Sequence, residues 1–258
     1  MPGLLILIIV LIVLFNPSIL PGLGSRLGGQ SRKPVRQAKW IWSSFTGTED
    51  ECIRAEQEYG QECARAFAKQ FSGSASRPDQ ELAEDVGTKL AGAVKDPRRT
   101  FRFTVAASAL ANAFALPGGY VFITGSLLDL CERDRNEIAF FLGHEIGHIL
   151  RGHARDHMTA NTFLSAITAR LPAAGQMLRH VVSQGYSRTM ELDADREAAR
   201  LAATAGFDAH AAISALKHLS QVSPDTSGLA EYLSSHPPIS ERIRELEKYL
   251  SPISQPTS

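Results

Sequence analysis

The segment NEIAFFLGHEIGHIL, residues 136–150, carries two histidines four positions apart. On an α-helix, residues with this spacing lie one turn apart on the same face, so His144 and His148 can direct two ring nitrogens at one metal ion. Glu145 projects about 100° away from His144, where a carboxylate can accept a proton from a metal-bound water. The spacing therefore predicts a metal-dependent hydrolytic site on this helix.

The side chains around the two histidines predict that this helix is buried. Aliphatic residues gather on the side opposite the histidines, at Ile138, Leu142, Ile146 and Ile149. Buried histidines and a buried glutamate need partners, and a divalent cation would satisfy all three. The alternative is an ordinary buried helix that carries the pattern by chance, because a single match of this kind is only a hypothesis.

A second segment, SRTMELDADREAARLAATAG at residues 187–206, is predicted to be a helix with two acidic residues on an alanine-rich face. The alanines would let this helix approach the first one closely. Because buried carboxylates are unfavourable without a positive partner, we assign Glu191 as the third metal ligand. Asp195, one turn further on, is placed to accept the free ring N–H of a ligand histidine. The alternative for both carboxylates is a buried salt bridge, for example to Arg188.

Around these two helices the sequence predicts an α+β domain that is mainly helical. Two further helices are expected, at about residues 49–71 and 79–94. The convincing β material is TFRFTVA followed by NAFALPGGYVFIT, in which residues 117–119 separate two short strands. From about residue 133 onward the chain is predicted to be helical. We expect the small sheet to pack beside the HEIGH helix.

The chain is expected to divide into a hydrophobic amino-terminal segment, a basic linker, a catalytic domain and a tail, at residues 1–25, 26–48, 49–250 and 251–258. Residues 1–23 are long enough to cross a membrane. No basic stretch precedes the apolar run, which favours a retained anchor over a cleaved signal. Basic residues in the linker would then hold the rest of the chain on the cytoplasmic side. The alternative is cleavage and export to the periplasm.

The composition excludes other classes of function. Lysine plus arginine total 27 and aspartate plus glutamate total 27, so there is no net charge and we expect no nucleic-acid partner. The three cysteines lack zinc-ribbon spacing, so neither a disulfide framework nor a cysteine metal site is expected. A hydrophobic content of 44% is enough to build a buried core.

Three motifs, NAFALPGGYVFITGSLL, HEIGH and SRTMELDAD, resemble those of the zinc metallopeptidases that include the CAAX prenyl endopeptidases, the HtpX-like heat-shock proteases and the BepA-like periplasmic proteases. The resemblance implies a zincin-like domain of the gluzincin type with one zinc ion per chain. It implies His144, His148 and Glu191 as zinc ligands and Glu145 as general base. Asp195 matches an aspartate with a proton-donating or orienting role.

The resemblance covers about residues 101–250 and implies two further functional positions. His236, in SSHPPISERI, matches a histidine that lies near the active site, although it also fits a helix start before two prolines. The strand that contains Asn112, Ala113 and Phe114 matches one that lies along the substrate cleft, where it would bind an extended peptide by strand addition. A plain β-hairpin arm is the alternative for this strand. The HtpX-like and prenyl proteases carry several membrane spans around the catalytic region, whereas this sequence has one candidate span, at its start.

Residues 156–186 connect the two ligand helices and are predicted to cover the cleft, whereas His153 and His157 are expected at the surface. Such a cover would restrict the cleft to flexible segments. We therefore expect a zinc-dependent endopeptidase that hydrolyses unfolded or membrane-associated proteins, in keeping with protein quality control. The alternative is a catalytically silent, membrane-tethered peptide-binding adaptor or chaperone-like module. A zinc hydrolase of non-peptide amides is a further alternative, which the cysteine pattern does not support.

Overall fold

The computed structural model describes residues 47–70, 76–109, 111–153, 155, 186–221 and 239–251. The predicted amino-terminal anchor at residues 1–25, most of the predicted cover at 156–186, and both His157 and His236 lie outside the described residues. All described residues belong to one compact unit, Trp40–Ser258. None of the helices described in this unit is long and apolar enough to cross a membrane. The predicted domain boundaries stay predictions.

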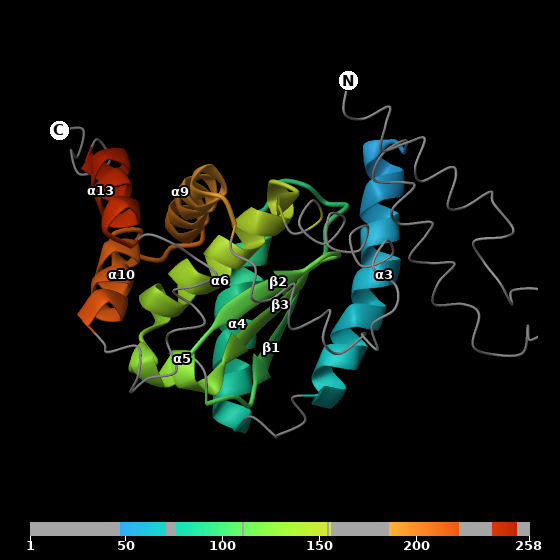
Figure 1. Ribbon diagram of the computed structural model, residues 1–258, viewed down its shortest axis with the longest axis horizontal. Helices are drawn as coiled ribbons and strands as arrows, with labels where there is room; N and C mark the ends of the chain where they lie inside the picture. The colour runs from blue at the N-terminus through green and yellow to red at the C-terminus, as the bar shows by residue number, and fades with distance from the viewer. Residues whose placement is uncertain are drawn as a thin grey trace, which may run out of the picture. The chain divides into compact units, whose positions relative to one another are not determined.

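A three-stranded mixed sheet lies at the middle of the described domain (Figure 1). Its strands are β1 (Arg102–Ala106), β2 (Ala113–Leu116) and β3 (Tyr120–Thr124), in the order β1-β3-β2. β1 runs parallel to β3, and β2 runs antiparallel to it. Gly118 and Gly119 form the turn between β2 and β3 with φ angles of 80° and 89°, which a side chain disfavours. A Cβ on Gly119 would also lie 1.8 Å from the carbonyl oxygen of Thr100.

Alternate side chains of the sheet enter two separate apolar clusters. One face packs on α4 (Arg77–Gly92) and α6 (Arg135–Leu150) and forms the main core. The other face packs on α3 (Glu49–Gln70), where Phe67 lies with its ring centroid 4.5 Å from Phe114 and 4.8 Å from Phe122. Both α3 and α4 lie within two residues of their predicted bounds. The small sheet therefore packs beside the HEIGH helix, as predicted.

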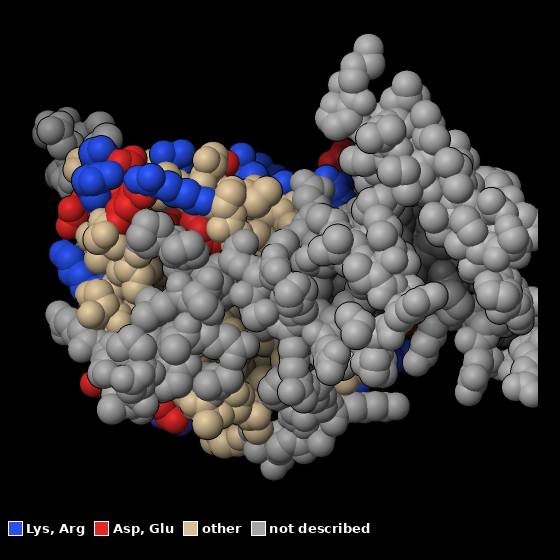
Figure 2. Space-filling view, viewed as in Figure 1, with Lys and Arg blue, Asp and Glu red and all other residues tan. Residues whose placement is uncertain are grey.

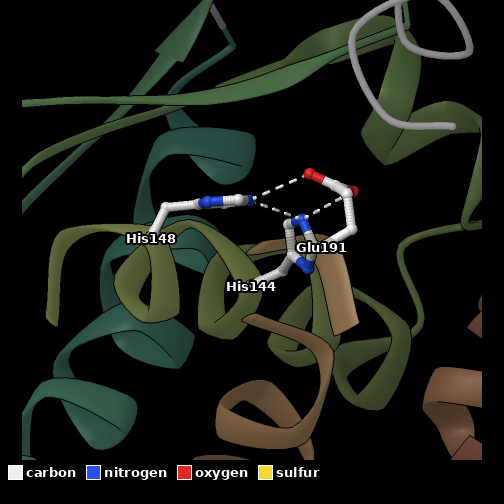
Figure 3. Close-up of side chains that lie close together, drawn as sticks. All are labelled: His144, His148 and Glu191. Carbon is white, nitrogen blue, oxygen red and sulfur yellow. Dashed lines mark hydrogen bonds and ion pairs between the residues drawn. The ribbon is translucent and has the colours of Figure 1, made fainter. Parts of the chain in front are cut away.

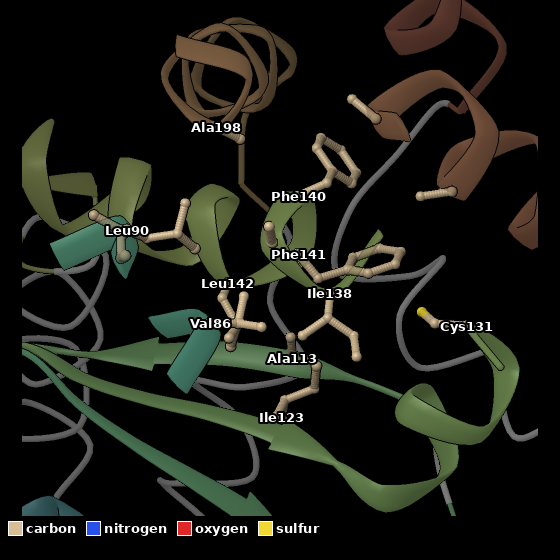
Figure 4. Packing of buried hydrophobic residues seen from close by; sticks show 14 of the residues in the cluster. Val86, Leu90, Ala113, Ile123, Cys131, Ile138, Phe140, Phe141, Leu142 and Ala198 are labelled. Carbon is tan, nitrogen blue, oxygen red and sulfur yellow. The ribbon is translucent and has the colours of Figure 1, made fainter. Parts of the chain in front are cut away.

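Helix α6 is enclosed on both sides. Figure 4 shows Ala198 of α9 (Arg188–Thr204) on one side of α6, and Ala113 and Ile123 of the sheet on the other. The short helix α5 (Gly125–Leu130) leads from β3 towards α6. The remaining described helices, α10 (Ala211–Gln221) and α13 (Ile239–Leu250), pack against each other and against α6 and α9. The predicted fold class, mainly helical α+β, is confirmed.

Candidate metal centre

Helix α6 presents its two histidines and the intervening glutamate inside the domain. The helix begins after Asp134, whose side chain accepts hydrogen bonds from two backbone N–H groups of the first turn. His144 and His148 have no exposed surface, and Glu145 is 1% exposed. Side chains of this kind are buried only where other polar groups or ions satisfy them.

Close contact between α6 and α9 brings the third predicted ligand to the histidines. A Cβ atom added to Gly147 would lie 3.0 Å from the carbonyl oxygen of Ala194, and one added to Gly143 would lie 3.2 Å from the Cα of Ala198. Glycines on α6 and alanines on α9 thus allow the two backbones to approach, as the alanine-rich face of α9 predicts. Glu191, in the first turn of α9, is consequently fully buried beside both histidines.

The three side chains point at a common centre (Figure 3). The Nε2 atoms of His144 and His148 are 3.0 Å apart. Glu191 Oε1 lies 3.3 Å from His148 Nε2, and Glu191 Oε2 lies 3.6 Å from His144 Nε2. Ligand atoms about 2.1 Å from a tetrahedral zinc ion lie about 3.4 Å from one another. The donor set therefore fits a tetrahedral ion, with one position left for water.

Two further buried groups contact these side chains. Oδ1 of Asp195 lies 2.9 Å from Nδ1 of His144, as expected for an acceptor that orients a ligand histidine. Arg242 of α13, which the sequence did not indicate, donates paired hydrogen bonds to Asp195 at 2.8 and 2.7 Å. Its Nη1 also lies 3.2 Å from Oε2 of Glu191. The arginine therefore joins the two acidic residues of α9.

The charges of this region fit a divalent cation. Three carboxylates, Glu145, Glu191 and Asp195, and one guanidinium, that of Arg242, are buried here, which gives these described groups a formal charge of −2 when the histidines are neutral. Burial and Arg242 act to lower the pKa of His144, but Glu191 and Asp195 outweigh them and raise it to about 9. A proton on His144 thus competes with a cation, and metal binding has to release it. Burial acts to raise the pKa of Asp195, but Arg242 and His144 outweigh it, so the pKa of this carboxyl is lowered.

His153 is buried, so the prediction that it lies at the surface is wrong. Gly152, with a φ of 74°, turns the chain after α6 so that Nδ1 of His153 lies 3.1 Å from Nδ1 of His148. Tyr186 stacks on His148 with ring centroids 3.8 Å apart and planes 18° from parallel. Burial raises the pKa of the Tyr186 phenol, which therefore stays protonated at neutral pH. The imidazole of His148 is thus held by residues on both of its flanks.

The predicted substrate strand, β2, lies at an edge of the sheet. Among the described strands it pairs only with β3. Asn112 and Ala113 are buried, and Phe114 packs against Phe67 and Phe122. The side chain of Phe114 therefore belongs to the apolar cluster beneath α3. Contact between this strand and a peptide would use the β2 backbone.

This combination of an HExxH helix with a glutamate from a second helix defines a metallopeptidase of the gluzincin type. Residues 77–250, more than half of the chain, match Peptidase family M48. The chain belongs to this family of zinc metalloproteases, and the family predicted from the three motifs is confirmed.

Individual relatives show the same likeness. The chain is 30% identical over 147 residues to the mitochondrial metalloendopeptidase OMA1 of Schizosaccharomyces pombe, a match that covers 54% of this chain and 43% of that protein. It is 29% identical over 185 residues to a putative beta-barrel assembly-enhancing protease of Vibrio cholerae, covering 64% and 38%. It is also 29% identical over 147 residues to metalloprotease YcaL of Escherichia coli, covering 52% and 56%. The match thus spans less than half of the yeast and Vibrio proteins.

Proposed function

We propose that this chain is a zinc-dependent endopeptidase that binds one zinc ion through His144, His148 and Glu191. The observation that carries the proposal is the convergence of these three buried side chains, whose ligand atoms all lie within 4.8 Å of one another. A bound zinc ion supplies Lewis-acid polarisation of the scissile carbonyl and lowers the pKa of a bound water.

The residues beside the ligands perform the proton transfers. Glu145, next to His144 on α6, acts as the general base that takes a proton from the attacking water and passes it to the leaving amine. Asp195 holds the Nδ1 proton of His144, so that Nε2 of this ring keeps its lone pair for the metal. His236 is proposed to approach the scissile carbonyl. Support for this role comes from its sequence position, six residues before Arg242.

We propose that the substrates are unfolded or membrane-associated proteins, bound as extended segments along β2. The position of β2 at the edge of the described sheet supports strand addition. Oδ1 of Asn112 supports it as well, because it is buried and has no hydrogen-bond partner within the described part of the chain. A backbone N–H of a bound peptide would satisfy this acceptor. The name of the Vibrio relative, an assembly-enhancing protease, is in keeping with quality control.

We also propose that residues 1–25 attach the protein to a membrane. The run from Leu4 to Phe15 contains no charged or polar side chain, and the first ionisable side chain is that of Arg26. Carbonate extraction of membranes, followed by the mass of the mature chain, tests this. A protein that begins near Ser25 and fractionates as soluble material would contradict the anchor and support export after cleavage.

The catalytic proposal is tested with the full chain in detergent, purified without chelators. We expect about one zinc ion per chain and cleavage of unfolded casein, with activity lost on chelation and restored by zinc. Glu145→Gln should keep the zinc and lower kcat/KM by at least about a thousandfold, because it removes the proton acceptor and leaves all three ligands in place. Glu191→Ala should lose the zinc.

The outcomes separate the enzyme from the alternatives. A folded parent protein without zinc would contradict the metallopeptidase. A zinc-loaded parent that binds casein without cleaving it would favour the silent adaptor. The endopeptidase is supported if the parent binds zinc and cleaves casein, Glu145→Gln keeps the zinc but loses cleavage, and Glu191→Ala loses the zinc.

A further inference from the structure

Helix α13 carries two arginines in opposite environments. Arg244 has a side chain that is 59% exposed and pairs with Glu241 and Glu245. Figure 2 shows basic and acidic side chains intermixed over this part of the surface. Arg242, by contrast, has no exposed surface and lies one turn before Leu246 on the buried face of the helix. An isolated buried charge is strongly unfavourable, so the partners of Arg242 must explain its position.

All three nitrogens of the Arg242 guanidinium contact acidic residues of α9. Nε and Nη2 donate to the two carboxylate oxygens of Asp195, at 2.8 and 2.7 Å. Nη1 lies 3.2 Å from Oε2 of Glu191. A planar fork of this kind fixes the orientation of a carboxylate, which a single point charge does not do. The orientation of the Asp195 carboxylate is therefore fixed, and Glu191 is held beside it by one contact.

The orientation of Asp195 determines which nitrogen of His144 is available to a metal. Oδ1 of Asp195 accepts from Arg242 Nη2, and it also lies 2.9 Å from His144 Nδ1. An ionised carboxylate only accepts hydrogen bonds, so the proton between these two atoms belongs to Nδ1. The lone pair of Nε2 then faces Glu191 and His148, where the other ligand atoms lie.

We propose that Arg242 is a positioning residue that holds Asp195 and Glu191 in the geometry required for zinc binding. The inference rests on the proposed function, because it takes these side chains as the zinc site. Arg242 acts mainly through the two carboxylates, and its Nη2 also lies 3.3 Å from Nδ1 of His144. The carboxy-terminal helix α13 thereby becomes part of the metal site, although the zinc ligands all come from α6 and α9.

The test compares Arg242→Lys with the matched control Arg244→Lys on the same helix. Zinc affinity of the full chain in detergent is measured by competition with a chromophoric chelator, and the absorption spectrum of bound Co²⁺ reports the coordination geometry. We expect Arg242→Lys to lower zinc affinity roughly 10- to 100-fold and to change the Co²⁺ spectrum, because an ammonium group cannot hold both carboxylates. Arg244→Lys should match the parent in both measurements.

A second variant separates positioning from simple charge compensation. Asp195→Asn combined with Arg242→Gln removes both members of the buried pair, which restores stability where a single substitution would leave an uncompensated charge. Asp195→Asn alone is the reference, because the loss of this acceptor weakens zinc binding by itself. If Arg242 only compensated the charge of Asp195, the double variant would bind zinc as Asp195→Asn does. Because Arg242 also holds Glu191, we expect the double variant to fold and to bind zinc at least about tenfold more weakly than Asp195→Asn.

Each outcome bears on a different claim. Parent-like zinc affinity in a folded Arg242→Lys protein, or a double variant that binds zinc as tightly as Asp195→Asn, would overturn the role of Arg242 and leave the endopeptidase intact. A parent protein that binds no zinc would overturn both the role of Arg242 and the proposed function. Weakened zinc binding in the Arg242 variants, with a normal Arg244→Lys control, supports the proposal.

Discussion

The two sides of helix α6 are packed by different means. Towards the sheet, Leu142 lies beside Val86 above the strands, and the contact consists of large aliphatic side chains (Figure 4). Towards α9, α6 offers Gly143 and Gly147, and the backbones themselves are in contact. The first side buries apolar area, which is non-directional and tolerates small shifts. The second side places ligand atoms, which tolerate little displacement.

This difference separates stability from metal affinity within one helix. Removing apolar area on the sheet side should lower the free energy of unfolding while the metal ligands stay in register. Changing the distance between α6 and α9 should disturb the ligands more than the fold. Substitutions on the sheet side should therefore change mainly the free energy of unfolding, and substitutions on the α9 side should change mainly the zinc affinity.

The largest loss of stability is expected from Leu142→Ala, on the sheet side. Leu142 is fully buried, and truncating a buried leucine costs about 3 kcal/mol through lost burial and the cavity left behind. Zinc affinity should stay within about twofold of the parent under conditions where the variant is folded, and urea unfolding followed by chelator competition measures both. Leu150→Ala, a partly buried position on the same helix, is the control and should cost about 1 kcal/mol. A tenfold loss of zinc affinity in Leu142→Ala would contradict the separation.

Gly147→Ala, on the α9 side, is expected to lose less stability than Leu142→Ala and more zinc affinity. Its new methyl group would lie 3.0 Å from the Ala194 carbonyl oxygen, so the helices must move apart by a few tenths of an ångström. We expect a cost of about 1 to 2 kcal/mol and zinc binding weakened about tenfold. Gly92→Ala, in α4 with open space around it, should be neutral or slightly stabilising. If Gly147→Ala binds zinc like the parent, close approach of the helices is not what places Glu191.

The features that local periodicity describes were predictable from the sequence. The spacing of His144 and His148 fixed one face of α6, and the alanine stripe fixed the face of α9 that carries Glu191 and Asp195. The two glycines at residues 118 and 119 marked the hairpin turn. In these cases the residues that interact lie within a few turns of one element, or between two elements that each carry a recognisable pattern.

Arg242 and His153 were missed because their partners lie outside such patterns. Arg242 and its main partner Asp195 are 47 positions apart, and a charged residue in a helix is usually exposed. The signal that could have revealed Arg242 is its place one turn before Leu246 on the buried stripe of α13. His153 follows Gly152, whose left-handed backbone ends the helical spacing on which the surface prediction relied. Arg188, the salt-bridge partner considered in the alternative for Glu191 and Asp195, pairs with Glu241.

The smallest effect concerns the attachment of α4 to the turn that precedes α6. Asp79 accepts a hydrogen bond from Nε of Arg133 at 2.9 Å. This bond, together with one from Ser76, holds the pKa of Asp79 below its ordinary value of 3.8. A carboxylate with a lowered pKa contributes stability above its unfolded pKa and loses that contribution as the pH falls through its folded pKa. The pair should therefore stabilise the protein at neutral pH and contribute nothing in strong acid.

Asp79→Asn removes this contribution at every pH. We expect it to cost about 1 kcal/mol near pH 7, and the difference from the parent should shrink as the pH falls below about 4 and through the lowered pKa of Asp79. Urea unfolding at several pH values measures this. Asp129→Asn, which removes a 65% exposed partner of the same arginine, should cost less at neutral pH because solvent screens that pair. Zinc affinity at neutral pH should be unchanged in both variants. If Asp79→Asn weakened zinc binding, the sheet side of α6 would control the ligands as well, and the two sides would act as one unit.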